Sequence, residues 1–459
     1  MHAQLLSIWN EVNSSYWFIP SLMVIAAIGL AFGLPALDGH LGDDWIANAE
    51  WLSANRPEGA RNLLTTVAGS MIGVAGVTFS ITIASVVYAS GQYGPRLLTN
   101  FMQDRGNQVT LGTFIATFLY CLLVLRTVRS AAEDGVNFVP HVALLVGLGL
   151  ALSSIGVLIY FIHHTPESIH VSNVIAGVGR DLQAKVESIF PERVGEGEAS
   201  RDAGVRTELP DAFFDQAVRV RARRSGYVQA IDDGSLMAAA TDGDLVLRLR
   251  YRPGDFAAQG DALVLAWPPD RAAGAQDTLR LAFALGAQRT ALQDTRFLVN
   301  ELVEIAARAL SPGVNDPFTA ITCLDWLGAA LKTLAARDLP GAERYDAAGA
   351  LRVVAEPSSF ADFLGHVFGQ LRPYLAADPN AALRAFLTMG EVAGRADADG
   401  RAALRHHADA LLAGALASLP VEADRQAVRQ RHAKLAQLLT GRVTFEQATA
   451  ETGWLGGTA

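Results

Sequence analysis

Hydroxyl side chains recur on one face of the longest uncharged stretch of the chain, residues 62–95. At helical spacing, Thr78, Thr82 and Ser85 fall on the same side of this stretch. Hydroxyl groups in such a position can line an aqueous path through a membrane. The alternative is that each hydroxyl donates to a backbone carbonyl one turn earlier, as threonine commonly does in apolar helices. The pattern predicts a pore lining at these three residues, with self-bonded hydroxyls as the alternative.

A second face of the same stretch carries small residues at helical spacing. They are Gly69, Gly73, Gly76 and Ser80. Small residues at this spacing let two helices approach closely in a membrane. The partner is either another helix of the same subunit or a helix of a second subunit. The pattern therefore predicts tight helix packing at these four residues.

Ionisable residues are absent from the interior of the predicted membrane segments. Carriers coupled to protons or ions usually place such a residue at membrane depth, whereas a channel can select with hydroxyls, carbonyls and apolar constrictions. His163, His164 and His170 match no metal-binding motif, and no nucleophile elbow or zinc-binding helix pair occurs. The sequence predicts no enzymatic activity, no cofactor and no bound metal.

Composition indicates a membrane domain joined to a soluble one. The chain has 459 residues, of which 51% are hydrophobic, and its mean hydropathy is positive. A net charge of −9 argues against a nucleic-acid partner, which usually requires a basic face. Cys121 and Cys323 have no neighbouring Cys or His at ligand spacing, so the sequence indicates neither a disulfide framework nor a zinc site.

Four apolar segments are long enough to cross a bilayer as helices. They cover residues 16–37, 62–93, 106–125 and 137–162. The second would extend ~50 Å, beyond a hydrocarbon core of ~30 Å, so it must tilt, break or project. Four crossings place both termini on one side. Basic residues are equally frequent on the two sides, and the large domain without disulfides favours cytoplasmic termini in a bacterial inner membrane.

The loop between the first two segments is acidic. Residues 38–61 hold five carboxylates and two arginines. With cytoplasmic termini this loop lies outside the cell, where negative charge would concentrate cations within a Debye length of ~8 Å. We expect Asp38, Asp43 and Asp44 to form this vestibule, which favours a cation as the permeant ion.

After the fourth apolar segment, the spacing of apolar residues changes several times along the chain. Residues 164–190 keep a helical period, which predicts an amphipathic juxtamembrane helix, and a polar linker follows at 191–217. Residues 218–268 alternate with period two between glycines, which predicts a small β domain. Residues 276–459 predict a helical domain, with one continuous helix expected from Gln276 to Leu310. The fold class is an α-helical membrane domain with a soluble α+β domain.

Two segments carry a resemblance to a known bacterial family. They are TFSITIASVVYASGQYGPRLLTNFMQDRGNQ (Thr78 to Gln108) and ALSPGVNDPFTA (Ala309 to Ala320). Over nearly its whole length the chain resembles the predicted membrane proteins grouped as domain of unknown function 2254. The resemblance implies an integral membrane protein but no particular activity. It also implies structural roles for Gln92, Pro95, Arg96, Arg289, Asp294, Asn315, Asp316 and Pro317.

A second, local resemblance covers residues 225–265. There SGYVQAID and YRPGDFAAQGDALV resemble the barrel-sandwich hybrid fold of lipoyl and biotinyl domains. Those carriers attach their cofactor to a lysine, but Lys185, Lys332 and Lys434 all lie outside this segment. A carrier role is therefore excluded, and a structural or docking role remains.

These observations lead to two hypotheses of different classes. The first is a homo-oligomeric ion channel whose second membrane segment lines the path and whose soluble domain gates it. The alternative is a membrane-anchored scaffold or sensor whose soluble domain binds a partner. The expected partners are a second copy of the chain, membrane lipids and ions. A scaffold should tolerate any apolar helix as its second segment, whereas a channel should not.

Overall fold

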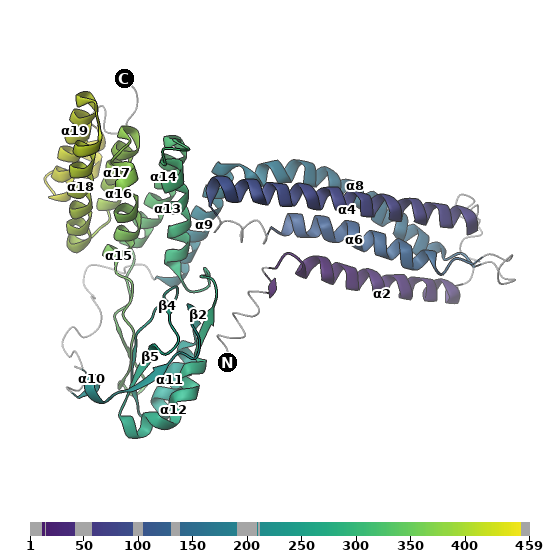
Figure 1. The fold of residues 1–459 in the computed structure, drawn as a ribbon, viewed down its shortest axis with the longest axis horizontal. Helices are drawn as coiled ribbons and strands as arrows, with labels where there is room; N and C mark the ends of the chain where they lie inside the picture. Colours follow the sequence, from purple (N-terminus) through teal and green to yellow (C-terminus); the bar gives the residue numbers. More distant parts are fainter. Residues whose placement is uncertain are drawn as a thin grey trace. The chain divides into compact units, whose positions relative to one another are not determined.

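The computed structural model describes residues 12–13, 15–41, 57–94, 104–129, 138–190, 209 and 212–450. The chain divides into two compact units, a membrane unit within Glu11–Asn173 and a soluble unit built from Val174 onward. Figure 1 shows both as ribbons coloured along the sequence.

Four helices of the membrane unit are long and apolar enough to cross a bilayer. They are α2 (Phe18–Leu41), α4 (Pro57–Tyr93), α6 (Arg105–Leu125) and α8 (His141–Ile169). The four predicted segments are confirmed, although α4 begins at Pro57 and α8 continues to Ile169. α4 stays helical throughout its length, so it does not break at its glycines.

The central helix of the membrane unit is α6. Of its most apolar window 56% is buried, against 22% for each of the other three helices. An apolar core surrounds the second half of α6, where Tyr120 and Cys121 are fully buried beside Leu64 of α4 and Ala143 of α8. The Tyr120 hydroxyl donates to the Ala143 carbonyl at 2.8 Å, so its polar atom is satisfied inside this core.

The soluble unit starts with α9 (Val171–Ile189). Its apolar face is buried by protein: Ile175, Leu182 and Val186 are at most 2% exposed. Lys185, on another face, donates to the Leu292 carbonyl at 2.7 Å, and burial lowers its pKa. The structure therefore differs from the predicted juxtamembrane helix over 164–190. Residues up to Ile169 continue α8, and the apolar stripe of α9 faces the soluble unit's own core.

Two small sheets form the β layer of the soluble unit. Their strand orders are β1-β5-β3-β8-β7 and β4-β2-β6. Neighbouring strands are antiparallel except β3 and β8, which are parallel. The strands are β1 (Val218–Arg221), β2 (Gly226–Ile231), β3 (Val246–Leu249), β4 (Phe256–Ala257), β5 (Ala262–Trp267), β6 (Phe283–Gly286), β7 (Glu343–Tyr345) and β8 (Leu351–Val354).

Helices complete the soluble unit. α10 (Phe213–Gln216), α11 (Asp233–Asp242) and α12 (Pro269–Leu281) accompany the strands. The later helices are α13 (Thr295–Ala309), α14 (Pro317–Ala335), α15 (Phe360–Leu364), the π-helical turn η2 (Gly365–Gly369), α16 (Gln370–Leu375), α17 (Pro379–Ala393), α18 (Ala398–Ser418), α19 (Glu422–Leu439) and α20 (Phe445–Ala450). α14, α15 and α17 each begin after a side-chain N-cap, provided by Asp316, Ser359 and Asp378 respectively.

Three expectations for the soluble region are corrected. Gln276 to Leu310 is not one helix, because Phe283 and Ala284 are adjacent and both buried, as in a strand covered on both faces. The β layer is not confined to residues 218–268, because β6, β7 and β8 come from later in the chain. The barrel-sandwich resemblance is not confirmed, since α11 and α12 separate the strands.

Candidate functional site

The hydroxyl face of α4 points into the membrane unit. Thr78 and Thr82 are each 3% exposed, on the same face as the buried Ala75 and Ala89. Thr82 donates to the Thr78 carbonyl at 2.9 Å, and Thr78 donates to its own helix in the same way. The self-bonded alternative is thus confirmed for both threonines, while Ser85 is half-buried. A path lined by this face would have to run inside one subunit, not along an axis shared by several.

The small-residue face of α4 points outward. Gly69, Gly73 and Gly76 are exposed, and a Cβ added at any of them would meet no described atom within 4 Å. Ser80 is exposed too, and its hydroxyl donates to the Gly76 carbonyl at 2.8 Å. Packing against another helix of the same subunit, one of the two predicted outcomes, is wrong for the described residues. The small-residue face of α4 is therefore the outward face, and the hydroxyl face is the inward one.

A partly buried carboxylate–histidine pair lies at the end of the membrane unit where α6 begins. Asp104 is the N-cap of α6, and its side chain accepts from the backbone N–H groups of Gly106 at 2.7 Å and Asn107 at 3.4 Å. Its second oxygen lies 2.8 Å from Nε2 of His164 on α8. The two side chains are 17% and 26% exposed.

An aromatic ring covers the pair from the α8 side. Tyr160 lies one turn before His164, and the two rings stack with their centroids 4.9 Å apart. Gly106 makes room for both side chains, because a Cβ there would lie 2.6 Å from the Tyr160 hydroxyl and 2.8 Å from His164 Nε2. The close approach of α6 and α8 at this end therefore requires glycine.

All four membrane segments place a polar side chain at this end. Tyr16, just before α2, lies beside Thr82 of α4 and within electrostatic reach of Asp104 of α6. We call this group the polar cluster. Its members are Tyr16, Thr78, Thr82, Asp104, Asn107, Gln108, Thr110, Tyr160, His164 and Thr165.

Two oxygens of the polar cluster have no hydrogen-bond partner among the described residues. They are Asn107 Oδ1 and Thr165 Oγ1, on side chains that are each 4% exposed. Buried polar atoms almost always have a partner, which can be water or another bound group. The polar cluster can therefore hold a water molecule or a small ion inside the membrane unit.

Polar residues continue from the cluster toward the middle of α6. Thr117 is fully buried, and its hydroxyl lies 3.3 Å from that of Ser154 on α8. Ser154 donates to the Leu150 carbonyl at 2.7 Å, so Thr117 is the donor of the pair. One turn further along α6, Tyr120 and the apolar core begin. The membrane unit is thus polar inside one half and closed by apolar side chains in the other.

The predicted vestibule is only partly described. Asp38 is 9% exposed, and its two oxygens accept from the backbone N–H groups of Val142 at 2.9 Å and Ala143 at 3.1 Å. It therefore caps the N-terminus of α8 from the neighbouring helix, and its carboxylate does not face an open vestibule. Asp43 and Asp44 lie outside the described residues.

The histidines near the membrane end do not act as a group. His163 is exposed and lies 3.6 Å from Glu167, whereas His164 belongs to the polar cluster. His170 forms the C-cap of α8. Among the described residues, no three His, Cys, Asp or Glu side chains come together as a metal site.

Family-motif residues in the soluble unit surround one tight turn. Asp294 is 2% exposed and accepts from Arg289 Nε at 3.0 Å and from Arg296 Nε at 3.4 Å. Arg296 also donates to the Pro253 carbonyl at 2.8 Å. A Cβ at Gly254, where φ is +89°, would lie 2.0 Å from Asp294 Oδ2. This network fixes the Gly254 turn on the start of α13.

The other motif residues shape a loop or lie outside the described atoms. Asn315 has a left-handed backbone with φ of 49°, and Asp316 caps α14, which begins at Pro317. The Gln92 side chain is outside the described part of the structure, as are Pro95 and Arg96.

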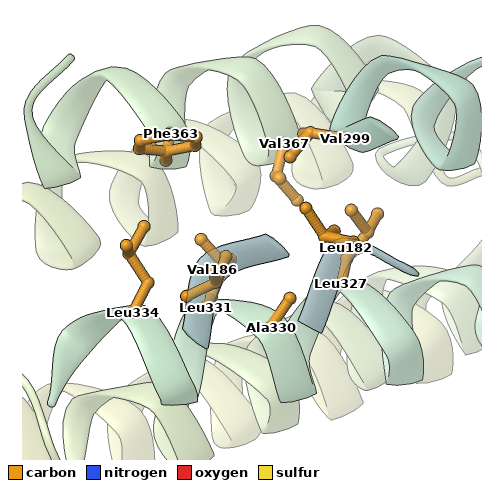
Figure 2. Close-up of a pocket in the computed structure, with 9 residues that line it drawn as sticks. All are labelled: Leu182, Val186, Val299, Leu327, Ala330, Leu331, Leu334, Phe363 and Val367. Carbon is orange, nitrogen blue, oxygen red and sulfur yellow. The ribbon is translucent and has the colours of Figure 1, made fainter. Parts of the chain in front are cut away.

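The soluble unit also contains a small apolar cavity. Figure 2 shows its lining by side chains from α9, α13, α14, α15 and η2. Its volume of ≈ 10 Å³ holds about one water-sized sphere, and its walls offer no polar partner, so it stays dry. The residues are Leu182, Val186, Val299, Leu327, Ala330, Leu331, Leu334, Phe363 and Val367.

Sequence reasoning did not select Asp104 or His164 as site residues. The two lie 60 positions apart, and no local spacing connects them. A signal was present, however, because the motif from Thr78 to Gln108 contains both Thr82 and Asp104. Residues from both parts of this motif belong to the polar cluster.

Known proteins resemble the chain over most of its length. It matches the family described as "Predicted membrane protein (DUF2254)" over residues 13–391. An uncharacterised protein of Mycobacterium bovis is 35% identical over 384 residues, which cover 81% of this chain and 70% of the relative. An uncharacterised protein of Mycobacterium tuberculosis is similar to the same extent. No solved structure matches the chain.

Proposed function

Since the chain belongs to the family of predicted membrane proteins DUF2254, we propose that it is a homo-oligomeric ion channel whose path begins in each subunit at the polar cluster. One observation carries the proposal: all four membrane segments send polar side chains to the same buried end. A simple anchor gains nothing from buried polar groups, which are costly in a bilayer. Two oxygens without a described partner support the presence of water or an ion there.

The apolar half of the unit supplies the closed gate of this channel. Leu64, Tyr120 and Cys121 are all fully buried, and apolar constrictions stop ions by excluding water. Movement of α8 past α6 would be needed to open them. Tyr160, His164 and Thr165 lie in the last turns of α8, and α9 begins one residue after α8 ends. The soluble unit can therefore act on the mouth of the path through α8.

Charge at the mouth favours a cation. Asp104 is the carboxylate of the cluster, and α4 contributes Thr78 and Thr82 to the same wall. Subunits are proposed to meet through the outward face of α4, whose glycines leave room for a close neighbour. With cytoplasmic termini in a bacterial inner membrane, the polar cluster is at the cytoplasmic end.

Conductance of the full-length protein in planar bilayers tests this function. We expect discrete steps that Asp104→Asn reduces at low salt and affects less at high salt, since salt screens a charge at the aqueous mouth of a path. Thr82→Trp should block the path, whereas Ile83→Trp should not, because Ile83 is 45% exposed on the outside of the same turn. Silent bilayers from folded oligomer would favour the membrane-anchored scaffold or sensor instead.

A further inference from the structure

The hairpin between α13 and α14 exposes two large apolar side chains at its tip. Phe318 is 77% exposed and Val314 is 49% exposed. From Leu310 to Leu324 the chain has one charged residue, Asp316. Its carboxylate accepts from the Thr319 N–H at 3.1 Å and from the Thr319 hydroxyl at 2.6 Å. The tip therefore presents apolar surface, and its single charge is engaged in a helix cap.

Backbone contacts fix the shape of this tip. Asn315 is held in the left-handed region, and the Asp316 N–H donates to the Ala309 carbonyl at 2.7 Å. The Asn315 N–H donates to the Ser311 carbonyl at 2.9 Å. Because the loop is closed by these bonds, Val314 and Phe318 are exposed in a defined conformation and need no apolar packing to keep it.

α9 and α14 lie side by side, since side chains of both helices line the same cavity (Figure 2). Gly179 of α9 lies against the Trp326 ring of α14. Just beyond the C-terminal ends of both helices, Arg337 donates to the carbonyl of Phe190 at 2.7 Å. Eleven residues separate the two contacts on each side, from 179 to 190 and from 326 to 337. The two helices therefore keep a parallel register.

This register places the tip at one end of the soluble unit. Phe318 precedes Trp326 by eight residues, which is ~12 Å along a helix. The same distance before Gly179 reaches Val171, where α9 begins. Only His170 separates that point from α8, the last helix long and apolar enough to cross a membrane. The tip thus lies at the end of the soluble unit where the chain arrives from the bilayer.

We propose that Val314 and Phe318 insert into the interfacial layer of the bilayer and hold the soluble unit at the lipid surface. An exposed aromatic on a tip whose single carboxylate is engaged in a helix cap suits the boundary between headgroups and acyl chains. The one-residue connection between α8 and α9 keeps this end of the unit close to lipid, so a bilayer is the nearest apolar partner. The proposal goes beyond the channel function and does not depend on it.

Quenching of a fluorophore at the tip tests the proposal in the full-length protein. The Val314→Cys variant is labelled with bimane and placed in nanodiscs that contain nitroxide lipids. Val421→Cys is the matched control, because Val421 is a valine elsewhere in the soluble unit and is 52% exposed. The native thiols Cys121 and Cys323 are both fully buried, and burial raises the pKa of Cys323, so labelling is selective. We expect nitroxide lipid to quench position 314 several-fold more than position 421.

Two other quenching results at position 314 would overturn the proposal. Quenching at position 314 by aqueous iodide and not by nitroxide lipid would place the tip in water. Protection from both quenchers would mean that protein covers it, for example a second copy of the chain. A Phe318→Asp change in the labelled protein should lower lipid quenching several-fold, whereas an unchanged signal would show that Phe318 does not insert.

Discussion

At the scale of single residues, Thr82 combines a structural and a proposed functional role. Its hydroxyl donates to the Thr78 carbonyl and also meets Tyr16 of the polar cluster. Thr82→Val keeps the volume but removes the hydroxyl, so we expect a several-fold lower conductance with a folded oligomer. Single-channel recording measures the effect.

Thr66→Val provides the matched control for Thr82. The Thr66 hydroxyl also donates to a carbonyl four residues earlier, at 2.7 Å, but the residue is exposed. Its replacement should leave conductance unchanged. Equal losses in both variants would mean that helix bonding, and not the polar cluster, determines conductance.

Gly254 allows a second prediction at this scale. A Cβ there would lie 2.0 Å from Asp294 Oδ2, in a turn that already has positive φ. Gly254→Ala should therefore disturb a buried ion pair, at a cost of about 3–5 kcal/mol in unfolding free energy. Thermal or denaturant unfolding of the purified protein measures this loss.

Gly260 is a control position for Gly254, because an alanine there would strain the backbone without a steric clash. It has φ of +90°, but a Cβ there would meet no described atom within 4 Å. Gly260→Ala should cost only about 1–2 kcal/mol, the strain of a side chain in the left-handed region. Similar losses in the two variants would contradict the role assigned to Asp294.

The contacts of a side chain can be predicted from the sequence only when its partner is close along the chain. The cap at Asp316 joins groups three residues apart, so a local Asp-Pro pattern is enough to indicate it. The contact between Asp104 and His164 joins two helices, and Asp38 caps a helix more than one hundred positions away. No local pattern contains such pairs, so the sequence could not assign these three side chains.

At the scale of elements, the outward face of α4 makes a prediction about assembly. Gly76→Leu adds bulk where the subunit has no described neighbour, so we expect a loss of oligomer with little change in subunit stability. Chemical crosslinking in lipid and mass photometry of the purified protein measure the subunit number. An oligomer that survives Gly76→Leu would place the subunit contact elsewhere.

Gly112 of α6 is the control position for Gly76, because it lies inside the membrane unit and not on its outward face. A Cβ there would lie 2.6 Å from the sulfur of Met23 on α2. Gly112→Leu should therefore lower the stability of the membrane unit itself, which appears as a lower melting temperature whatever the subunit number.

Helical periodicity identified the two faces of α4 but not their surroundings. The small residues and the hydroxyl residues were correctly separated, since that separation depends only on 3.6 residues per turn. Which face is covered depends on the position of α6, and the threonines can be buried because their own helix satisfies their hydroxyls. The short strand β6 was missed for a related reason, since periodicity does not distinguish a short buried strand from a helix.

At the scale of the whole molecule, membrane topology is open to a direct test. Four crossings predict that Asp44 is outside the cell and Ser200 inside. Single cysteines at these positions, reacted with an impermeant thiol reagent in intact cells, should show labelling only at position 44. Labelling only at position 200 would reverse the orientation, and labelling at both would contradict the number of crossings.

The unequal lengths of α4 and α6 make bilayer thickness a variable for this protein. α4 has 37 residues and α6 has 21, lengths of ~55 Å and ~32 Å as helices. A hydrocarbon layer of ~30 Å matches α6 but leaves a hydrophobic mismatch for α4, which tilt or local thickening must relieve. Lipids with longer acyl chains reduce that mismatch for α4 and create one for α6. The protein should therefore respond to acyl-chain length as a physical input and distribute into membrane regions according to their thickness.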